Sequence, residues 1–91
     1  MWDPLNHDFG DQLEGQTLTT EFIATGTKRI REIESTCNCI TWSRQENILT
    51  VFWKINVKRR ERDISTSLLI EYIDGSIDEL ELKTHVIINN T

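Results

Sequence analysis

The segment ILTVFWKINVKRRERDISTSLLIEY, residues 48–72, decides what fold the sequence predicts. Its first half places apolar side chains at odd positions, namely Leu49, Val51, Trp53, Ile55 and Val57. Its second half places Ile64, Thr66, Leu68, Ile70 and Tyr72 at even positions. A period of two is typical of β-strands with one buried face. The sequence therefore predicts strands over residues 48–57 and 64–73, separated by the charged run Lys58–Asp63.

These two strands are predicted to pair as an antiparallel hairpin. A slip of one residue would turn one apolar set to the opposite face, so we expect Val57 opposite Ile64. The next turn is predicted over residues 74–76, because a three-residue loop keeps Leu82 on the core face, opposite Leu68. A further strand is expected over residues 77–88.

The predicted registers leave an apolar cluster on the outer face of the sheet. Its members are Ile48, Phe52, Leu69, Ile73 and Ile77. Small monomeric proteins rarely expose a cluster of this kind to water. We therefore predict that it binds a protein partner or a second copy of the chain, unless the N-terminal residues cover it.

The N-terminal half is predicted to contribute a helix. Leu18, Phe22, Ile30, Ile33 and Cys37 recur at steps of four, eight, three and four, which indicates helical periodicity. An alternative interpretation makes residues 19–25 a strand and only residues 28–35 helical. Residues 37–42 are expected to form a short strand, and residues 43–47 a turn.

Residues 1–16 are predicted to be an irregular N-terminal arm, since Pro4, Gly10 and Gly15 interrupt them. Trp2, Leu5 and Phe9 are its candidate anchors. Residues 17–91 then form a single small α+β domain, in which an N-terminal helix packs on an antiparallel β-meander of about four strands. The expected core comprises the alternating residues above other than Thr66, together with Leu80 and Leu82. Leu18, Phe22, Ile30 and Ile33 of the helix cover it.

Charge is distributed unevenly along the 91 residues. Residues 28–62 carry a net charge of +5 between two terminal segments of −5 each. This pattern argues against a general nucleic-acid coat and allows one local basic patch. The candidate patch is the basic loop, Lys58, Arg59, Arg60 and Arg62, which is either a solvated hairpin tip or a contact for phosphate or an acidic protein.

The chain lacks a recognisable catalytic or cofactor motif. Cys37 and Cys39, with the distant His7 and His85, do not form the usual spacing of a zinc site. We expect no cofactor, no metal and no enzymatic activity, and we expect the two cysteines to be reduced thiols. The N-terminus has neither a basic nor an apolar leader segment, so a cytoplasmic or nuclear protein without a membrane partner is predicted.

Two resemblances follow from particular residues. REIEST (31–36) and LLIEYIDGSIDELEL (68–82) resemble the helix-plus-meander layout of RWD domains, over about residues 28–83. The resemblance implies a small interaction module like those of ubiquitin-pathway adaptors and kinetochore subunits. Tyr72 is retained, but both prolines of that family's Tyr-Pro-x-x-x-Pro turn are absent. Separately, MWDPL (1–5) is similar to the start of precoat proteins of whitefly-borne plant geminiviruses.

The predicted function is a non-enzymatic protein-interaction module that binds another protein or itself. Binding would use the outer apolar cluster or an exposed strand edge. The alternative is a small regulatory or inhibitory protein of viral or mobile-element type. Such a protein would use its acidic ends against a basic target surface and the basic loop against nucleic acid.

Overall fold

The computed structural model describes residues 2–26 and 28–88, and these residues form eight β-strands and no helix. The strands are β1 (Trp2–Asp3), β2 (Asn6–Leu13), β3 (Thr17–Ala24), β4 (Ile30–Ser35), β5 (Ile40–Gln45), β6 (Ile48–Lys54), β7 (Arg62–Tyr72) and β8 (Ile77–Ile87). The prediction of an α+β domain with an N-terminal helix is therefore wrong. With no helix in the described ranges, none is available to cross a membrane.

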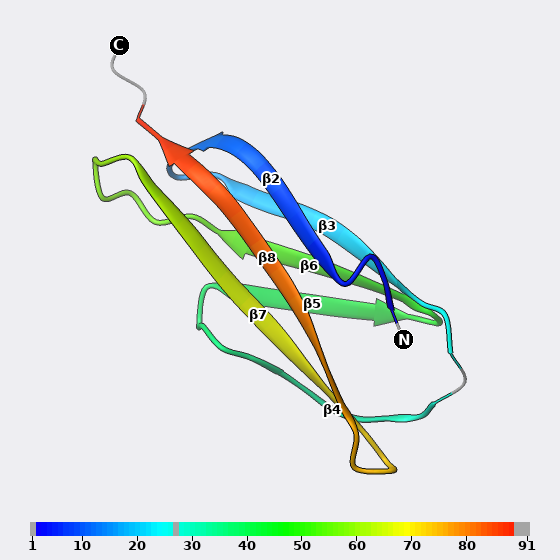
Figure 1. Ribbon diagram of the computed structural model, residues 1–91. Helices are drawn as coiled ribbons and strands as arrows, with labels where there is room; N and C mark the ends of the chain where they lie inside the picture. The colour runs from blue at the N-terminus through cyan, green and yellow to red at the C-terminus, as the bar shows by residue number, and fades with distance from the viewer. Residues whose placement is uncertain (1, 27, 89–91) are drawn as a thin grey trace.

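The strands form two sheets that face each other (Figure 1). Sheet 1 has the order β1-β3-β6-β5, and sheet 2 has the order β2-β8-β7-β4. All pairings are antiparallel except that of β2 with β8, which is parallel. This is the arrangement of an immunoglobulin-type sandwich, in which strands A, B, E and D face strands C, F and G and the first strand is divided between the sheets.

The core lies between the two sheets and is built from the inward-facing residues of each strand. Sheet 1 contributes Leu18, Phe22, Leu49, Val51 and Trp53, and sheet 2 contributes Leu68, Ile70, Tyr72, Leu80, Leu82 and Val86. The predicted burial of the alternating residues from Leu49 to Ile55 and from Leu68 to Leu82 is confirmed. Val57 is an exception, since it is 64% exposed in the loop after β6.

The helix prediction failed because its spacing also fits strands. A step of four, from Leu18 to Phe22, keeps one face of a strand just as it keeps one face of a helix. The step of three from Ile30 to Ile33 is accommodated by a register irregularity in β4, which inserts one extra residue. Both isoleucines therefore pack against the core from a strand. The alternative interpretation of a strand at residues 19–25 agrees with β3.

The predicted hairpin between residues 48–57 and 64–73 is also wrong. β6 pairs with β3 and β5, whereas β7 pairs with β8 and β4. Residues 55–61 instead cross from one sheet to the other, a separation of about 10 Å. Alternation cannot distinguish these two arrangements, because strands in facing sheets and strands in one hairpin both direct their apolar side chains toward a shared core.

The strands β7 and β8 pair in a register that differs from the prediction, but their side chains lie on the predicted faces of the sheet. Leu68 lies opposite Leu80 rather than Leu82, a shift of two residues. Because two is the period of a strand, the shift leaves both leucines on the core side. Gly75 has a φ of 88°, a left-handed conformation that suits glycine in such a turn.

Residues predicted as an irregular arm contribute β1 and β2. Trp2 is buried between the sheets and Phe9 packs against the core, whereas Leu5 is exposed. The arm therefore completes both sheets and does not lie over an outer face. This topology also differs from the helix-plus-meander layout that the RWD resemblance implied.

Candidate interaction surfaces

The structure does not bring the predicted apolar cluster together. Ile48 and Phe52 lie on the outer face of sheet 1, opposite residues of β3 and β5. Leu69 and Ile77 lie on the outer face of sheet 2, and Ile73 lies in the turn after β7. The five residues therefore form no single patch, because the hairpin that would have joined them is absent. That any of them contacts a partner stays a prediction.

One edge of sheet 1 is formed by β5. β5 pairs with β6 in a continuous register, and its other side faces no described strand. The Lys54 N–H donates to the Cys39 carbonyl oxygen at 2.9 Å, which fixes the hydrogen-bonding phase of this ladder. Cys39 and Lys54 therefore form a hydrogen-bonded pair. Bonded and non-bonded pairs alternate along an antiparallel ladder, so Trp42 and Arg44 are in non-bonded pairs. Their N–H and C=O groups point away from β6, toward the free edge.

Among the strands of the described ranges, the other three sheet edges carry features that oppose pairing. β1 has only two residues, and it covers only the Ile23–Ala24 end of β3. β2 has a register irregularity between Asp8 and Asp11, and β4 has one before Glu32, which is followed by Glu34. Short length, bulges and charged side chains all protect edges against added strands. β5 has six residues, no irregularity and a single charge, that of Arg44.

The surface around this edge is mostly uncharged. On the outer face of sheet 1, Phe52 lies between Thr19 and Thr41 on the neighbouring strands. Ile23 and Ile48 lie opposite each other at the end of the sheet and are both exposed. Trp42, on the inward side of β5, is still 41% exposed because its strand is the last in the sheet. Sequence reasoning missed β5 as a site because part of it was predicted to be a turn.

The outer face of sheet 2, in contrast, is rich in charged side chains. Carboxylates from all four of its strands lie on the outer face, namely Asp8, Asp11, Glu32, Glu34, Asp63, Glu71, Glu79 and Glu81. Lys83 and His85 are the basic or titratable side chains of β8 on this face. The predicted acidic segments at the two ends of the chain therefore meet on one surface, together with two glutamates of β4.

The basic loop is held by a carboxylate from a different part of the chain. Glu14, in the turn after β2, accepts the backbone N–H groups of Lys58 and Arg59 and an Nη1 hydrogen bond from Arg62 at 2.8 Å. These hydrogen bonds hold the pKa of Glu14 below its usual value, with the Lys58 N–H contributing most. The sequence carries no local signal for this contact, since Glu14 lies 44 residues before Lys58.

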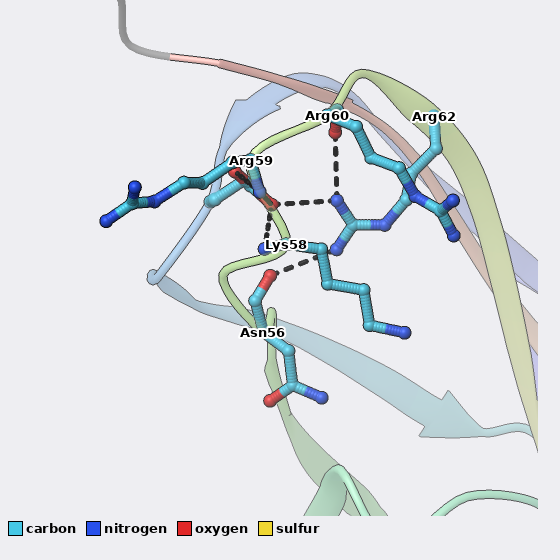
Figure 2. A network of polar contacts seen from close by, with 6 residues as sticks. Asn56, Lys58, Arg59, Arg60 and Arg62 are labelled. Carbon is cyan, nitrogen blue, oxygen red and sulfur yellow. Dashed lines mark hydrogen bonds and ion pairs between the residues drawn. The ribbon is translucent and has the colours of Figure 1, made fainter.

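The four predicted basic residues consequently have different roles. The Arg62 guanidinium also donates to the carbonyl oxygens of Arg60 and Asn56, both at 3.0 Å (Figure 2). Arg62 is therefore engaged in holding the loop. The side chains of Lys58, Arg59 and Arg60 are exposed, and that of Arg59 extends away from the loop in Figure 2.

A buried chain of hydrogen bonds joins the two sheets. The Trp2 Nε1–H of β1 donates to the Tyr72 hydroxyl at 2.6 Å, and this hydroxyl donates to Asp78 Oδ2 at 2.6 Å. Burial and the Asp78 carboxylate raise the pKa of Tyr72 to about 12, because both disfavour the phenolate. The network is structural, since the hydroxyl is enclosed and both of its partners are provided by the protein.

A shallow hollow of about 340 Å³ lies on sheet 2 beside Asp8, Asp63, Lys83 and His85. His85 Nδ1 lies 2.7 Å from Asp63 Oδ1, and this hydrogen bond raises the pKa of His85 above its usual value. No trio of His, Cys, Asp and Glu side chains within residues 2–26 and 28–88 converges on a metal position.

The two cysteines lie close together in a turn. Their Cα atoms are 5.3 Å apart, and the Cys39 N–H donates to Cys37 Sγ at 3.0 Å. Residues 36–39 form a bend and turn, whereas the prediction placed both cysteines on a strand. That the thiols are reduced stays a prediction. Neither cysteine lies in β3 or β7, so the inter-sheet disulfide of antibody domains has no counterpart here.

Comparisons with known proteins support the fold. No family model and no curated protein matches the sequence. The chain is similar to part of an endo-fucoidan hydrolase of glycoside hydrolase family 107, with a TM-score of 0.66, 10% identity and coverage of 98% of this chain and 14% of that chain. It is also similar to the GspB Siglec domain, with a TM-score of 0.55, 12% identity and coverage of 99% and 58%.

A third similar structure is a 2,6-sialyltransferase from Vibrionaceae Photobacterium sp., in complex with CMP and lactose. Its TM-score is 0.51, its identity is 10%, and the match covers 91% of this chain and 18% of that chain. The chain thus spans less than two thirds of the length of each of these three proteins. At such identities the likeness shows the fold alone, so function must be argued from the surface itself.

Proposed function

We propose that this chain is a non-enzymatic protein-interaction module that binds an extended segment of a partner along the free edge of β5. The observation that carries the proposal is a difference between the outermost strands of the two sheets. Among the four that the structure describes, β5 alone is longer than two residues, regular and nearly uncharged. An added strand would pair with the outward N–H and C=O groups of Trp42 and Arg44. A cytoplasmic or nuclear location, expected from the sequence, belongs to the same proposal.

Side chains beside the edge supply specificity in this proposal. A partner strand in register with β5 would place alternate side chains next to Trp42 and next to Thr41. Aromatic side chains at such positions often dominate binding energy, because they bury a large area with few rotatable bonds. The absence of carboxylates on β5 favours a close approach by the partner backbone.

A proline substitution separates backbone pairing from side-chain effects. Arg44→Pro removes an outward N–H and leaves the β5–β6 hydrogen bonds intact, a position where proline is tolerated. Arg44→Ala removes the same charge and keeps the N–H. Peptides selected from a displayed random library should bind the wild type and Arg44→Ala with similar affinity, and should bind Arg44→Pro at least tenfold more weakly.

The location of binding is checked by amide chemical shifts and hydrogen exchange. The N–H groups of Trp42 and Arg44 should become protected when a peptide binds. Equal peptide affinity for Arg44→Pro and Arg44→Ala would contradict the proposal. If no peptide is selected but sedimentation shows a dimer that Arg44→Pro disrupts, the segment bound at the edge belongs to a second copy of the chain.

The acidic outer face of sheet 2 supports a second candidate, a regulator that binds a basic protein surface. Clustered carboxylates attract a basic partner at long range, and salt screens that attraction. Binding through this face should weaken steeply with ionic strength and should be lost in Glu79→Gln/Glu81→Gln. Binding through the β5 edge should be nearly independent of salt and of these two substitutions.

A further inference from the structure

A small cavity of about 170 Å³ lies beside the first residues of β7, beyond the end of β4. The residues that line it are the basic and polar Lys54, Asn56, Lys58, Arg62, Ser65 and Thr66, together with Cys37, Cys39, Trp53, Ile55 and Ile64. No Asp or Glu of the described residues lines the cavity. Three other hollows of the described structure each have at least one Asp or Glu in their lining.

Among the described residues, only one of the three basic residues that line the cavity forms an ion pair. Glu14 neutralises Arg62 through their 2.8 Å ion pair. The ammonium groups of Lys54 and Lys58 form no ion pair with a residue in the ranges that the structure describes. Like charges that share a cavity repel each other, and a bound anion would convert that repulsion into attraction.

The backbone of β7 adds a donor to the same place. The Ser67 N–H donates to Thr36 Oγ1 at 3.1 Å, on the β4 side of the strand. Because N–H directions alternate along a strand, the Ser65 N–H points to this side as well, where β4 has already ended. Ser65 lines the cavity, and its N–H has no acceptor among the described residues. Backbone N–H groups together with ammonium groups form strong, charge-assisted sites for oxyanions.

We infer that this cavity binds an oxyanion of the phosphate class, with Lys54, Lys58 and the Ser65 N–H as its ligands. Arg62 positions the loop that carries Lys58, because its guanidinium is committed to Glu14, Arg60 and Asn56. The phosphate group could belong to free inorganic phosphate or to a phosphorylated side chain of a protein. The inference does not depend on the β5 proposal, since the cavity and its donors exist whether or not the edge is occupied.

The test is a titration of the labelled protein with inorganic phosphate at constant ionic strength, followed by amide chemical shifts. We expect saturable shifts that centre on Ser65 and Lys58. Lys54→Ser/Lys58→Ser should weaken phosphate binding about tenfold or more, as expected for losing charge-assisted contacts. The matched control is Arg59→Ser/Arg60→Ser, which removes the same charge from the same region without touching the cavity lining, and its affinity should stay within twofold of the wild type.

Two results would overturn the inference. One is a titration without saturable shifts near the cavity, and the other is an equal loss of affinity in Arg59→Ser/Arg60→Ser, which would show diffuse attraction to the loop. A parallel titration with N-acetyl-phosphoserine amide identifies the source of the anion. Tighter binding than inorganic phosphate assigns the site to a phosphorylated side chain, and equal or weaker binding assigns it to the free anion. Arg44→Pro should leave these titrations unchanged, so the two proposals fail separately.

Discussion

The hydroxyl of Tyr72 is a sharp test of how the two sheets are joined. Tyr72→Phe keeps the ring and removes both the acceptor of the Trp2 Nε1–H and the donor to Asp78. A buried N–H left without an acceptor costs about 1–3 kcal/mol, and a hydrogen bond to a charged group contributes about 1.5–3 kcal/mol. Since one hydroxyl makes both bonds, we expect the free energy of unfolding to fall by about 2–4 kcal/mol.

This loss is large for a domain of this size, whose total stability is expected to be about 5–15 kcal/mol. Urea unfolding followed by far-UV circular dichroism measures it. With a urea slope of about 1–2 kcal/mol per molar, the midpoint should fall by roughly 2 M. A loss below about 0.5 kcal/mol with an unchanged slope would show that the hydroxyl is not satisfied by Trp2 and Asp78 as described.

A double-mutant cycle isolates the bond that joins the sheets. Trp2→Phe alone removes the N–H donor and should cost about 1 kcal/mol beyond the smaller ring. In the Tyr72→Phe background the same change should cost less, because the N–H there has no acceptor to lose. Equal costs of Trp2→Phe in both backgrounds would refute the contact between these two side chains.

The same hydroxyl makes stability depend on alkaline pH. The pKa of Tyr72 is raised to about 12 from the ordinary 10, so the folded state favours the neutral phenol. This contribution is complete below pH 10 and is lost as the pH rises through 12. Tyr72 is the single tyrosine of the chain, so ultraviolet absorbance of the phenolate reports its titration alone. Tyr72→Phe should remove this part of the alkaline loss of stability.

Four further substitutions test other parts of the structure. Phe22→Ala should destabilise the fold by about 3–5 kcal/mol, whereas Ile23→Ala should cost about 1 kcal/mol or less, because β3 buries Phe22 and exposes Ile23. Equal losses of stability in urea unfolding would contradict the strand assignment of β3. Asp63→Asn should lower the raised pKa of His85, measured by NMR titration, and should remove a contribution to stability that is present below pH 6.5 and lost as the pH rises through the raised pKa. Glu14→Gln should speed hydrogen exchange in the basic loop and remove a contribution that is present above pH 4.5 and lost at lower pH, while unchanged exchange would show that the carboxylate does not hold the loop.

The candidate surfaces could be anticipated only in part. A strand edge was among the predicted binding modes, but the edge of β5 was not identified, because residues 43–47 were predicted to be a turn. The predicted apolar cluster depended on the pairing of Val57 with Ile64. That pairing is absent, so the five residues do not form one cluster. Of the predicted loop Lys58–Asp63, residues 58–61 do lie in a loop, but Arg62 and Asp63 begin β7. The sequence could not predict that Arg62 holds the loop while its neighbours are exposed, because the contact depends on the distant Glu14.

The sequence by itself determined most of the residues that lie inside this protein, although Val57 proved exposed and Trp2, from the predicted arm, proved buried. Alternation from Leu49 to Ile55 and from Leu68 to Leu82 is a local property of each strand, and the hydrophobic effect acts on it whatever the strand pairs with. Only the tertiary structure decided which strands are neighbours, because hydrogen bonding between backbones is nearly independent of side chains. Three features depend on which strands are neighbours: the free edge at β5, the Glu14 contact and the cavity beside Ser65. The hydrophobic pattern of the sequence does not predict which strands are neighbours.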